Sequence, residues 1–292
     1  MIVVTTPNGN TGKHVLRALV ERGETVRAIS YRPELISADL REKCEIVVGS
    51  PNDAEVLTRG FAGAESVFWC VPTSNQWDDG AAYYGAFTDA ATAALAANGN
   101  AARLVAIGSG GYGAKNAGFM TILAQAEDTL NTTGVPTRHL RCGYFMENVF
   151  WFMQSLQTQN PIFELYAPDA PIPWVAAQDI AAVAVRSLCD RDWRDQSAIP
   201  VYGAADMSMN EAAVILSEVL QTPVRYAQST DAQTAQVLRQ FHSGEGFIEA
   251  SAQFARAVSA GEYGRDKRVP EGTTPTTLRE WAMQYLLPVF RS

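Results

Sequence analysis

Short apolar runs rich in β-branched residues alternate with amphipathic segments along the first half of the chain. In Lys13–Arg22 the apolar residues fall on one face at the period of an α-helix, and they are Val15, Leu16, Leu19 and Val20. The apolar runs predict strands at Ile2–Thr5, Thr25–Ser30, Glu45–Val48, Ser66–Val71, Arg103–Ile107 and Thr137–Arg141. Because strands that alternate with helices build parallel sheets, the pattern predicts an α/β fold with a doubly wound parallel sheet.

The pattern loosens after residue 141. The segment Gly143–Gln157 is aromatic and apolar, and four prolines within Pro161–Trp174 exclude the interior of a helix there. Helical patterns return at 177–189, 212–220, 232–242, 247–260 and 277–287. Ser208 and Glu211 have the spacing of a capping box at the start of one of these helices. We therefore expect a smaller, mostly helical C-terminal region over the carboxyl edge of the sheet, where ligands of open α/β folds bind.

Composition and charge narrow the class of protein. The 292 residues are 47% hydrophobic and 18% charged, as in an ordinary globular protein. Lysine and arginine number 23 against 31 aspartates and glutamates, and the net charge of −8 repels nucleic acid and anionic lipid. No run approaches the roughly 20 apolar residues that span a bilayer, and the first residues do not resemble a signal peptide. We expect a cytoplasmic protein that acts on a small molecule, without nucleic acid or membrane as partner.

The cysteines and histidines do not indicate a metal site. The four cysteines lie far apart, mostly inside apolar runs where a thiol behaves as a small hydrophobe, and they are Cys44, Cys70, Cys142 and Cys189. The three histidines and four cysteines include no run with the spacing of a zinc site. We therefore expect neither a metal centre nor a disulfide framework.

The predicted first strand runs directly into a turn that contains two glycines. A strand, a glycine turn and the N-terminus of a helix place bare backbone N–H groups where a diphosphate binds. Gly9 would allow the close approach of the diphosphate, and Gly12 would allow the helix to pack tightly on the strand. Thr6 stands at the first glycine position of the usual fingerprint, and the alternative is that the glycines only shape a tight turn. The residues expected to bind a dinucleotide here are Thr6, Asn8, Gly9, Asn10, Thr11 and Gly12.

The residues after the second strand indicate which dinucleotide fits. An acidic residue there would accept a hydrogen bond from a ribose 2′-hydroxyl, whereas this chain has Tyr31 and Arg32. Because a guanidinium suits a 2′-phosphate, these two residues favour NADP(H) over NAD(H). The alternative is that Arg32 is a solvated surface residue next to Glu34.

Several longer phrases resemble one family. They are Asn8–Gly12, Arg27–Ile29 before Arg32 and Pro33, Phe61–Phe68, Gly143–Asn148, Trp174–Ala181 and Ala257–Glu262. Over nearly its whole length the chain resembles the NmrA-like branch of the atypical short-chain dehydrogenases. That resemblance implies a Rossmann domain that binds NADP(H) and a small C-terminal region that closes over the substrate. The family includes quinone, azo-dye, triphenylmethane-dye and imine reductases, and also redox-sensing regulators that bind the dinucleotide without turnover.

The resemblance also implies positions in the site. By position, the residues that follow three strands are expected to line the adenosine side (Val71, Pro72 and Thr73), the ribose (Gly108 and Ser109) and the nicotinamide (Gly143, Tyr144 and Phe145). Helical spacing places Tyr144 and Asn148 on one face, which we assign to a pocket for a planar acceptor, and Phe150 on another. The residues expected to contact substrate are Tyr144, Asn148 and Trp174, although the aromatic cluster also serves as ordinary core. Residues 1–142, with 175–203, are predicted to form the NADP(H)-binding domain, and 143–174 and 204–292 to cover the substrate.

The chain departs from related dehydrogenases at the catalytic pair. Those enzymes place a tyrosine and a lysine four residues apart after the fifth strand, where this chain has Thr121 and Gln125. One Tyr-x-x-x-Lys match exists at Tyr263–Lys267, but it lies far along the chain, and chance is the simpler explanation. By location Tyr112 is a better candidate for the proton donor, with Lys115 nearby, although a tyrosine in a glycine-rich loop often serves as lid or packing.

Ser109 is expected to donate a hydrogen bond to a substrate oxygen, since no positioned histidine or lysine would make it a nucleophile. The sequence thus predicts an NADPH-dependent reductase that passes hydride to a conjugated or electron-poor acceptor, such as a quinone, enone, imine or iminium. A polycyclic ketone as substrate is a variant of this prediction. The alternative from another class is a non-catalytic NADP(H) sensor.

Overall fold

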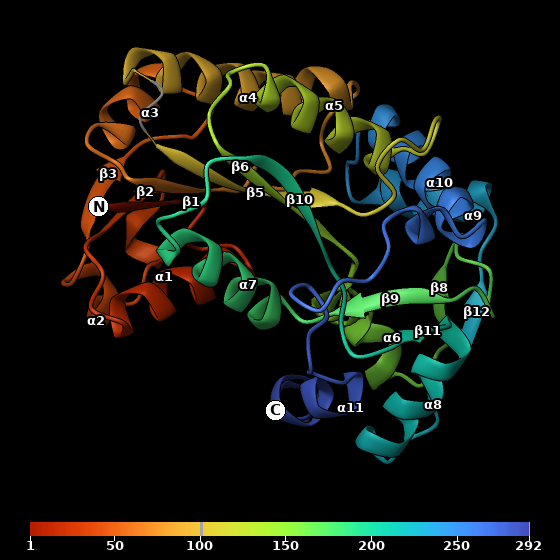
Figure 1. Ribbon diagram of the computed structural model, residues 1–292. Helices are drawn as coiled ribbons and strands as arrows, with labels where there is room; N and C mark the ends of the chain where they lie inside the picture. The colour runs from red at the N-terminus through yellow and green to blue at the C-terminus, as the bar shows by residue number, and fades with distance from the viewer. Residues whose placement is uncertain (100–101, 292) are drawn as a thin grey trace.

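A seven-stranded parallel sheet forms the centre of the computed structural model, which describes residues 1–99 and 102–291 (Figure 1). Its strands lie side by side in the order β10 (Gln196–Val201), β6 (Thr137–Cys142), β5 (Arg103–Ser109), β4 (Ser66–Trp69), β1 (Ile2–Thr5), β2 (Val26–Ser30) and β3 (Glu45–Val48). Each neighbouring pair runs parallel. The doubly wound parallel sheet expected from the sequence is confirmed.

Strand β1 shows how the sheet buries both faces. Val3 packs in one hydrophobic cluster and Ile2 and Val4 in another, because successive side chains of a strand point to opposite faces. The helices on the face of Ile2 and Val4 are α1 (Gly12–Glu21), α2 (Ala38–Arg41) and α7 (Ala177–Cys189). Those on the face of Val3 are α3 (Ala54–Phe61), α4 (Gly80–Ala97) and α5 (Phe119–Asn131). Helices therefore cover the sheet on both sides (Figure 1).

The smaller region contains two short sheets and several helices. The strands β7 (Tyr144–Phe145), β9 (Ile172–Val175) and β11 (Asp206–Met207) form one sheet, and β8 (Ile162–Glu164) pairs with β12 (Tyr226–Gln228). The helices are α6 (Met153–Gln157), α8 (Met209–Leu220), α9 (Asp231–Gln240), α10 (Glu245–Ser259), α11 (Leu278–Trp281) and α12 (Leu287–Phe290). The capping box expected at the start of α8 is present, with Ser208 and Glu211 bonded reciprocally.

One local expectation was wrong. Tyr144 does not lie on a helix with Asn148, because Tyr144 and Phe145 are extended and pair with Trp174 and Val175 of β9. A 3-10 helix, Met146–Phe152, begins only after this strand. Pairing with a strand distant in sequence has decided the conformation here, and local periodicity carries no information about it.

Two elements of the second half return to the large sheet. Helix α7 packs against α1, and β10 extends the sheet beside β6. In the described part of the chain no helix combines the length and apolarity needed to cross a membrane.

Candidate functional site

The strand order reverses between β1 and β4. The chain leaves β1 toward β2 on one side and leaves β4 toward β5 on the other. In open α/β sheets, ligands bind at the carboxyl ends of the strands at such a switch point. The turn after β1 and the loop after β4 meet at this place.

The turn after β1 is fastened to the end of β4. The Thr6 hydroxyl donates to the Cys70 carbonyl at 2.6 Å, and the Cys70 N–H donates to Thr5 Oγ1 at 3.0 Å. Thr6 has a left-handed φ of 51°, which bends the chain away from the strand. These bonds fix the turn before the first helix begins.

Gly12 is required by close packing at the start of α1. A Cβ on Gly12 would lie 2.1 Å from the Thr6 carbonyl oxygen, whereas one on Gly9 would make a tight contact of 3.2 Å with the Thr6 side chain. In residues 1–99 and 102–291, no acceptor is hydrogen-bonded to the backbone N–H groups of Asn10, Thr11 and Gly12. Free N–H groups at a helix N-terminus suit an anion such as a diphosphate.

Asn8 connects this turn to the end of β2. Its Nδ2 donates to Ser30 Oγ at 3.1 Å and to the Arg32 carbonyl at 2.9 Å. The Arg32 guanidinium lies 4.9 Å from the centre of the Tyr31 ring and donates to the Tyr31 hydroxyl. Both side chains are exposed, and Arg32 forms no ion pair, with Glu34 or otherwise, within the described residues. The structure thus gathers Asn8, Tyr31 and Arg32 beside the turn.

The residues expected on the adenosine side follow β4 directly. Val71 and Pro72 are partly buried and Thr73 is exposed. The Tyr83 hydroxyl of α4 donates to the Pro72 carbonyl at 2.9 Å and holds this loop against the helix. Gly108 and Ser109 end β5 on the other side of β4, and the Ser109 hydroxyl donates to the Gly110 carbonyl at 3.0 Å.

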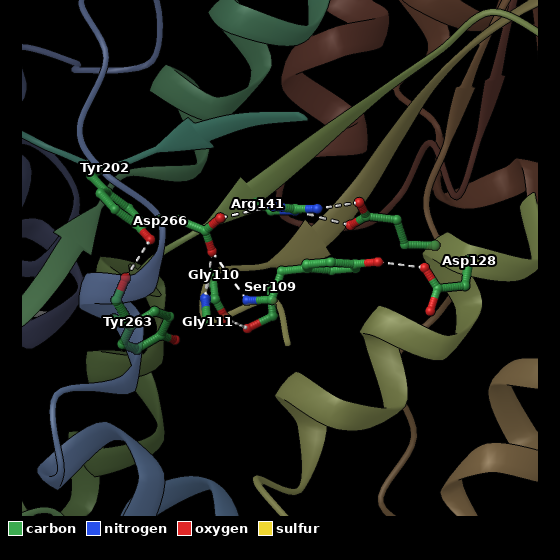
Figure 2. A network of polar contacts seen from close by, with 10 residues as sticks. Ser109, Gly110, Gly111, Asp128, Arg141, Tyr202, Tyr263 and Asp266 are labelled. Carbon is green, nitrogen blue, oxygen red and sulfur yellow. Dashed lines mark hydrogen bonds and ion pairs between the residues drawn. The ribbon is translucent and has the colours of Figure 1, made fainter. Parts of the chain in front are cut away.

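A buried ionic network closes the carboxyl ends of β5 and β6 (Figure 2). Arg141 donates to both oxygens of Glu127, at 2.5 and 3.1 Å, and to Asp266 Oδ1 at 2.8 Å. The other Asp266 oxygen accepts the N–H groups of Gly111 and Tyr112, at 2.7 and 3.1 Å. Burial raises the pKa of Glu127, and its bonds to Arg141 oppose that shift. The network ties a C-terminal loop to the glycine-rich turn after β5.

Tyr112 has its proton engaged by an acid. Its hydroxyl donates to Asp128 Oδ1 on α5 at 2.6 Å, and this hydrogen bond raises the pKa of Tyr112. The Arg141 guanidinium lies 3.9 Å from the centre of the Tyr112 ring. Lys115 is exposed, so the structure does not join it to Tyr112 as a catalytic pair. The assignment of Tyr112 as proton donor stays a prediction that this geometry does not favour.

The residues expected at the nicotinamide and the acceptor lie together. A Cβ on Gly143 would lie 2.0 Å from the Pro173 carbonyl oxygen, so only glycine allows β7 to run this close to β9. The ring centres of Tyr144 and Trp174 are 4.7 Å apart. Burial raises the pKa of Tyr144, and the nearby Asn148 side chain opposes that shift. Trp174 is 1% exposed and its indole N–H donates to the Met207 carbonyl at 3.0 Å, so it supports the wall from behind.

Sequence reasoning missed three residues of this neighbourhood. Tyr263 and Asp266 come from the C-terminal loop, and Glu164 ends β8 close enough to Tyr144 to raise its pKa. Burial raises the pKa of Glu164 itself to about 7. The Tyr-x-x-x-Lys match at Tyr263–Lys267 was the sequence signal for this loop. It was set aside because it lies far along the chain from Ser109. Of the two matching residues only Tyr263 is buried at this place, because Lys267 is exposed.

The sheet order, the turn after β1 and the free N–H groups define a Rossmann-type dinucleotide-binding protein. The chain belongs to the NAD(P)H-binding family, whose sequence model matches residues 7–190. The resemblance to NmrA-like proteins noted in the sequence is confirmed.

Individual relatives cover nearly the whole chain. The (4-alkanoyl-5-oxo-2,5-dihydrofuran-3-yl)methyl phosphate reductase of Streptomyces griseus is 26% identical over 290 residues, 98% of either chain. An NAD(P)H azoreductase of Xenophilus azovorans is 27% identical over 259 residues, 86% of this chain and 84% of that one. The crystal structure of an NADPH-dependent quinone oxidoreductase of Escherichia coli, complexed with NADPH, has a TM-score of 0.79 at 19% identity, covering 98% of this chain and 99% of that one. This last likeness establishes a shared fold.

Proposed function

We propose that the protein is an NADPH-dependent reductase that transfers hydride to a conjugated or electron-poor small molecule, such as a quinone, an enone, an imine or iminium, or a polycyclic ketone. The observation that carries this proposal is the role of Thr121, which stands where related dehydrogenases have their catalytic tyrosine. Its hydroxyl accepts the Ala117 N–H at 3.0 Å and donates to the Ala114 carbonyl at 3.1 Å, so it serves the backbone. The usual acid is therefore missing from α5. Conjugated and cationic acceptors tolerate this loss because their charge is delocalised or already positive at the hydride-transfer step.

The residues after β1 and β2 fit NADP(H). The free N–H groups of Asn10, Thr11 and Gly12 would hold the diphosphate, and Arg32 has no carboxylate partner in the described part of the chain to compete with a 2′-phosphate. NADPH, when bound, supplies the hydride. The protein's task is to orient it and to exclude water.

Aromatic side chains after β6 provide a wall for a planar acceptor. The Tyr144 ring meets Trp174 and Tyr166 edge to face, with ring centres 4.7 and 5.5 Å away. The Asn148 side chain lies near the buried Tyr144 hydroxyl, but among the described residues no partner has the geometry of a hydrogen bond to it. A buried hydroxyl without a partner is costly, and an acceptor oxygen or nitrogen would satisfy it. The reductase names of the two curated relatives support the same reaction class.

The test is oxidation of NADPH by the purified protein with a quinone, an enone, a cationic dye and a simple aliphatic ketone. We expect NADPH absorbance to fall with at least one conjugated or cationic acceptor and not with the simple ketone. The Gly12→Ala variant, prepared in parallel and assayed at limiting NADPH, is expected to be at least roughly tenfold less active and so controls for contaminating reductases. Activity on the simple ketone alone would contradict the proposal. Calorimetric binding of NADP(H) without turnover of any acceptor would instead support the sensor.

A further inference from the structure

The C-terminal strap, residues 261–268, brings a tyrosine to the end of β5. Tyr263 lies in a 3-10 helix, Glu262–Arg265, and its ring packs on Gly110, directly after Ser109 (Figure 2). A Cβ on Gly110 would lie 2.7 Å from Cδ1 of Tyr263. The ring therefore occupies space that only glycine at position 110 leaves open.

Polar contacts pin the strap in this place. The Tyr202 hydroxyl, at the end of β10, donates to the Tyr263 carbonyl at 3.0 Å. Asp266, three residues further on, accepts from the N–H groups of Gly111 and Tyr112 and pairs with Arg141. The position of Tyr263 is thus fixed from both sides, as positioned chemistry requires.

The surroundings of the Tyr263 ring are apolar. The ring is 4% exposed and meets Tyr202 and Phe254 edge to face at 6.4 and 6.0 Å. Burial raises the pKa of Tyr263, whereas an interaction with the Ser109 side chain lowers it. The phenol therefore stays protonated at neutral pH.

We propose that Tyr263 is the proton donor for the reduced acceptor and that the Ser109 hydroxyl orients it. This inference rests on the proposed reductase function. Two further phenols lie at this turn, and both already donate their protons: Tyr112 to Asp128 and Tyr202 to the Tyr263 carbonyl. The strap would thus provide the acid that Thr121 of α5 does not.

The proton transfer balances with water as the final source. Hydride addition to a neutral quinone or enone leaves an electron pair and a negative charge on the acceptor oxygen. The O–H bond of Tyr263 breaks while a new O–H bond forms on that oxygen, and the tyrosinate then takes a proton from water. A cationic dye is neutralised by the hydride alone and needs no proton at this step.

The experiment compares Tyr263→Phe with Tyr285→Phe, a matched control whose hydroxyl donates to Gln178 in the C-terminal segment. We expect Tyr263→Phe to lower kcat with a neutral quinone roughly tenfold. This is less than the roughly 10²- to 10⁴-fold that a general acid usually contributes, because a quinone delocalises the charge that the hydride leaves. The rate with a cationic dye and the NADPH affinity measured by calorimetry should stay unchanged. A readout without turnover is the binding of 4-nitrophenolate, whose oxygen carries the charge of the reduced acceptor. It should bind Tyr263→Phe roughly tenfold more weakly, since one hydrogen bond to a charged group is lost.

The outcomes separate this inference from the function on which it rests. If the wild-type protein reduces none of the acceptors, the reductase function fails and the donor role fails with it. If the wild-type protein is active and Tyr263→Phe keeps its rate with quinone, or loses quinone and dye activity equally, Tyr263 is not the acid. Ser109→Ala gives a second test should Tyr263→Phe not fold: a kcat lowered with quinone but not with dye supports the pair, and equal rates overturn it.

Discussion

Arg141 and Asp266, 125 positions apart in the sequence, form an ion pair of 2.8 Å between Nη1 and Oδ1. Their side chains are only 15% and 8% exposed, so the pair is shielded from water and salt. Arg141 lies one residue before the end of β6, whereas Asp266 belongs to the C-terminal strap. One buried bond thus joins the sheet to the segment that carries Tyr263.

Removal of the Asp266 carboxylate should destabilise the protein. In Asp266→Ala, Arg141 keeps Glu127 but loses one buried partner, and two backbone N–H groups lose their acceptor. We expect the free energy of unfolding to fall by about 3 kcal/mol, as for other broken buried pairs. Urea unfolding measures this loss. The control is Asp231→Ala, which breaks the exposed pair with Arg256 and should cost at most about 1 kcal/mol. Equal losses of stability in the two variants would show that burial of the Arg141–Asp266 pair is unimportant.

Gly12→Ala should disturb the turn that binds the diphosphate. The new Cβ would lie 2.1 Å from the Thr6 carbonyl oxygen, so the turn must shift. We expect a loss of about 1–3 kcal/mol in stability, the usual cost of overpacking. Calorimetry should show NADPH affinity reduced at least roughly tenfold. In Gly85→Ala, where the new Cβ on α4 meets nothing within 4 Å, stability should instead rise by about 1 kcal/mol with binding unchanged.

Arg32→Ala should distinguish the two dinucleotides. If the guanidinium binds the 2′-phosphate, NADPH affinity should fall roughly 10- to 100-fold, since a hydrogen bond to a charged group contributes about 1.5–3 kcal/mol. NADH lacks that phosphate, and its affinity should not change. Both are measured by calorimetry, with Arg59→Ala, an exposed arginine of α3, as control. An equal loss for both dinucleotides would exclude Arg32 as the source of the preference.

Much of the fold follows from local patterns in the sequence. The strands Ile2–Thr5 and Glu45–Val48 were predicted with the bounds that the structure shows, and so was the capping box of Ser208 and Glu211. Helix periodicity, caps and β-branched runs are properties of neighbouring residues, so one sequence suffices to recognise them. The turn around Gly9 and Gly12 was recognised for the same reason.

The candidate site was less predictable because it depends on contacts between distant segments. Tyr144 was expected on a helix, but pairing with Trp174 makes it part of a strand. Tyr263 was set aside because it lies far along the chain from Ser109. Its place beside Gly110 depends on the pairing of Asp266 with Arg141, which local periodicity does not reveal.

Protonation of His139 should destabilise the fold in mild acid. The ring is 2% exposed on β6, and burial, together with the charge of Arg141, lowers its pKa from 6.5 to about 4. The unfolded chain therefore takes up this proton at a higher pH than the folded protein does. The corresponding stability is fully present above pH 6.5 and is lost as the pH falls toward 4. The slope approaches about 1.4 kcal/mol per pH unit, and the total is about 3 kcal/mol.

Urea unfolding of wild type and His139→Gln at a series of pH values measures this contribution. Glutamine can still donate to Asn131 Oδ1, which His139 Nε2 contacts at 2.9 Å, but it does not titrate. All acidic residues contribute equally to both proteins, so the difference between the two curves isolates the histidine. We expect the difference in free energy of unfolding to be constant above pH 6.5. Below that pH the wild-type protein should lose stability relative to His139→Gln. Parallel curves down to pH 4 would show that His139 accepts its proton as readily in the folded protein as in the unfolded chain.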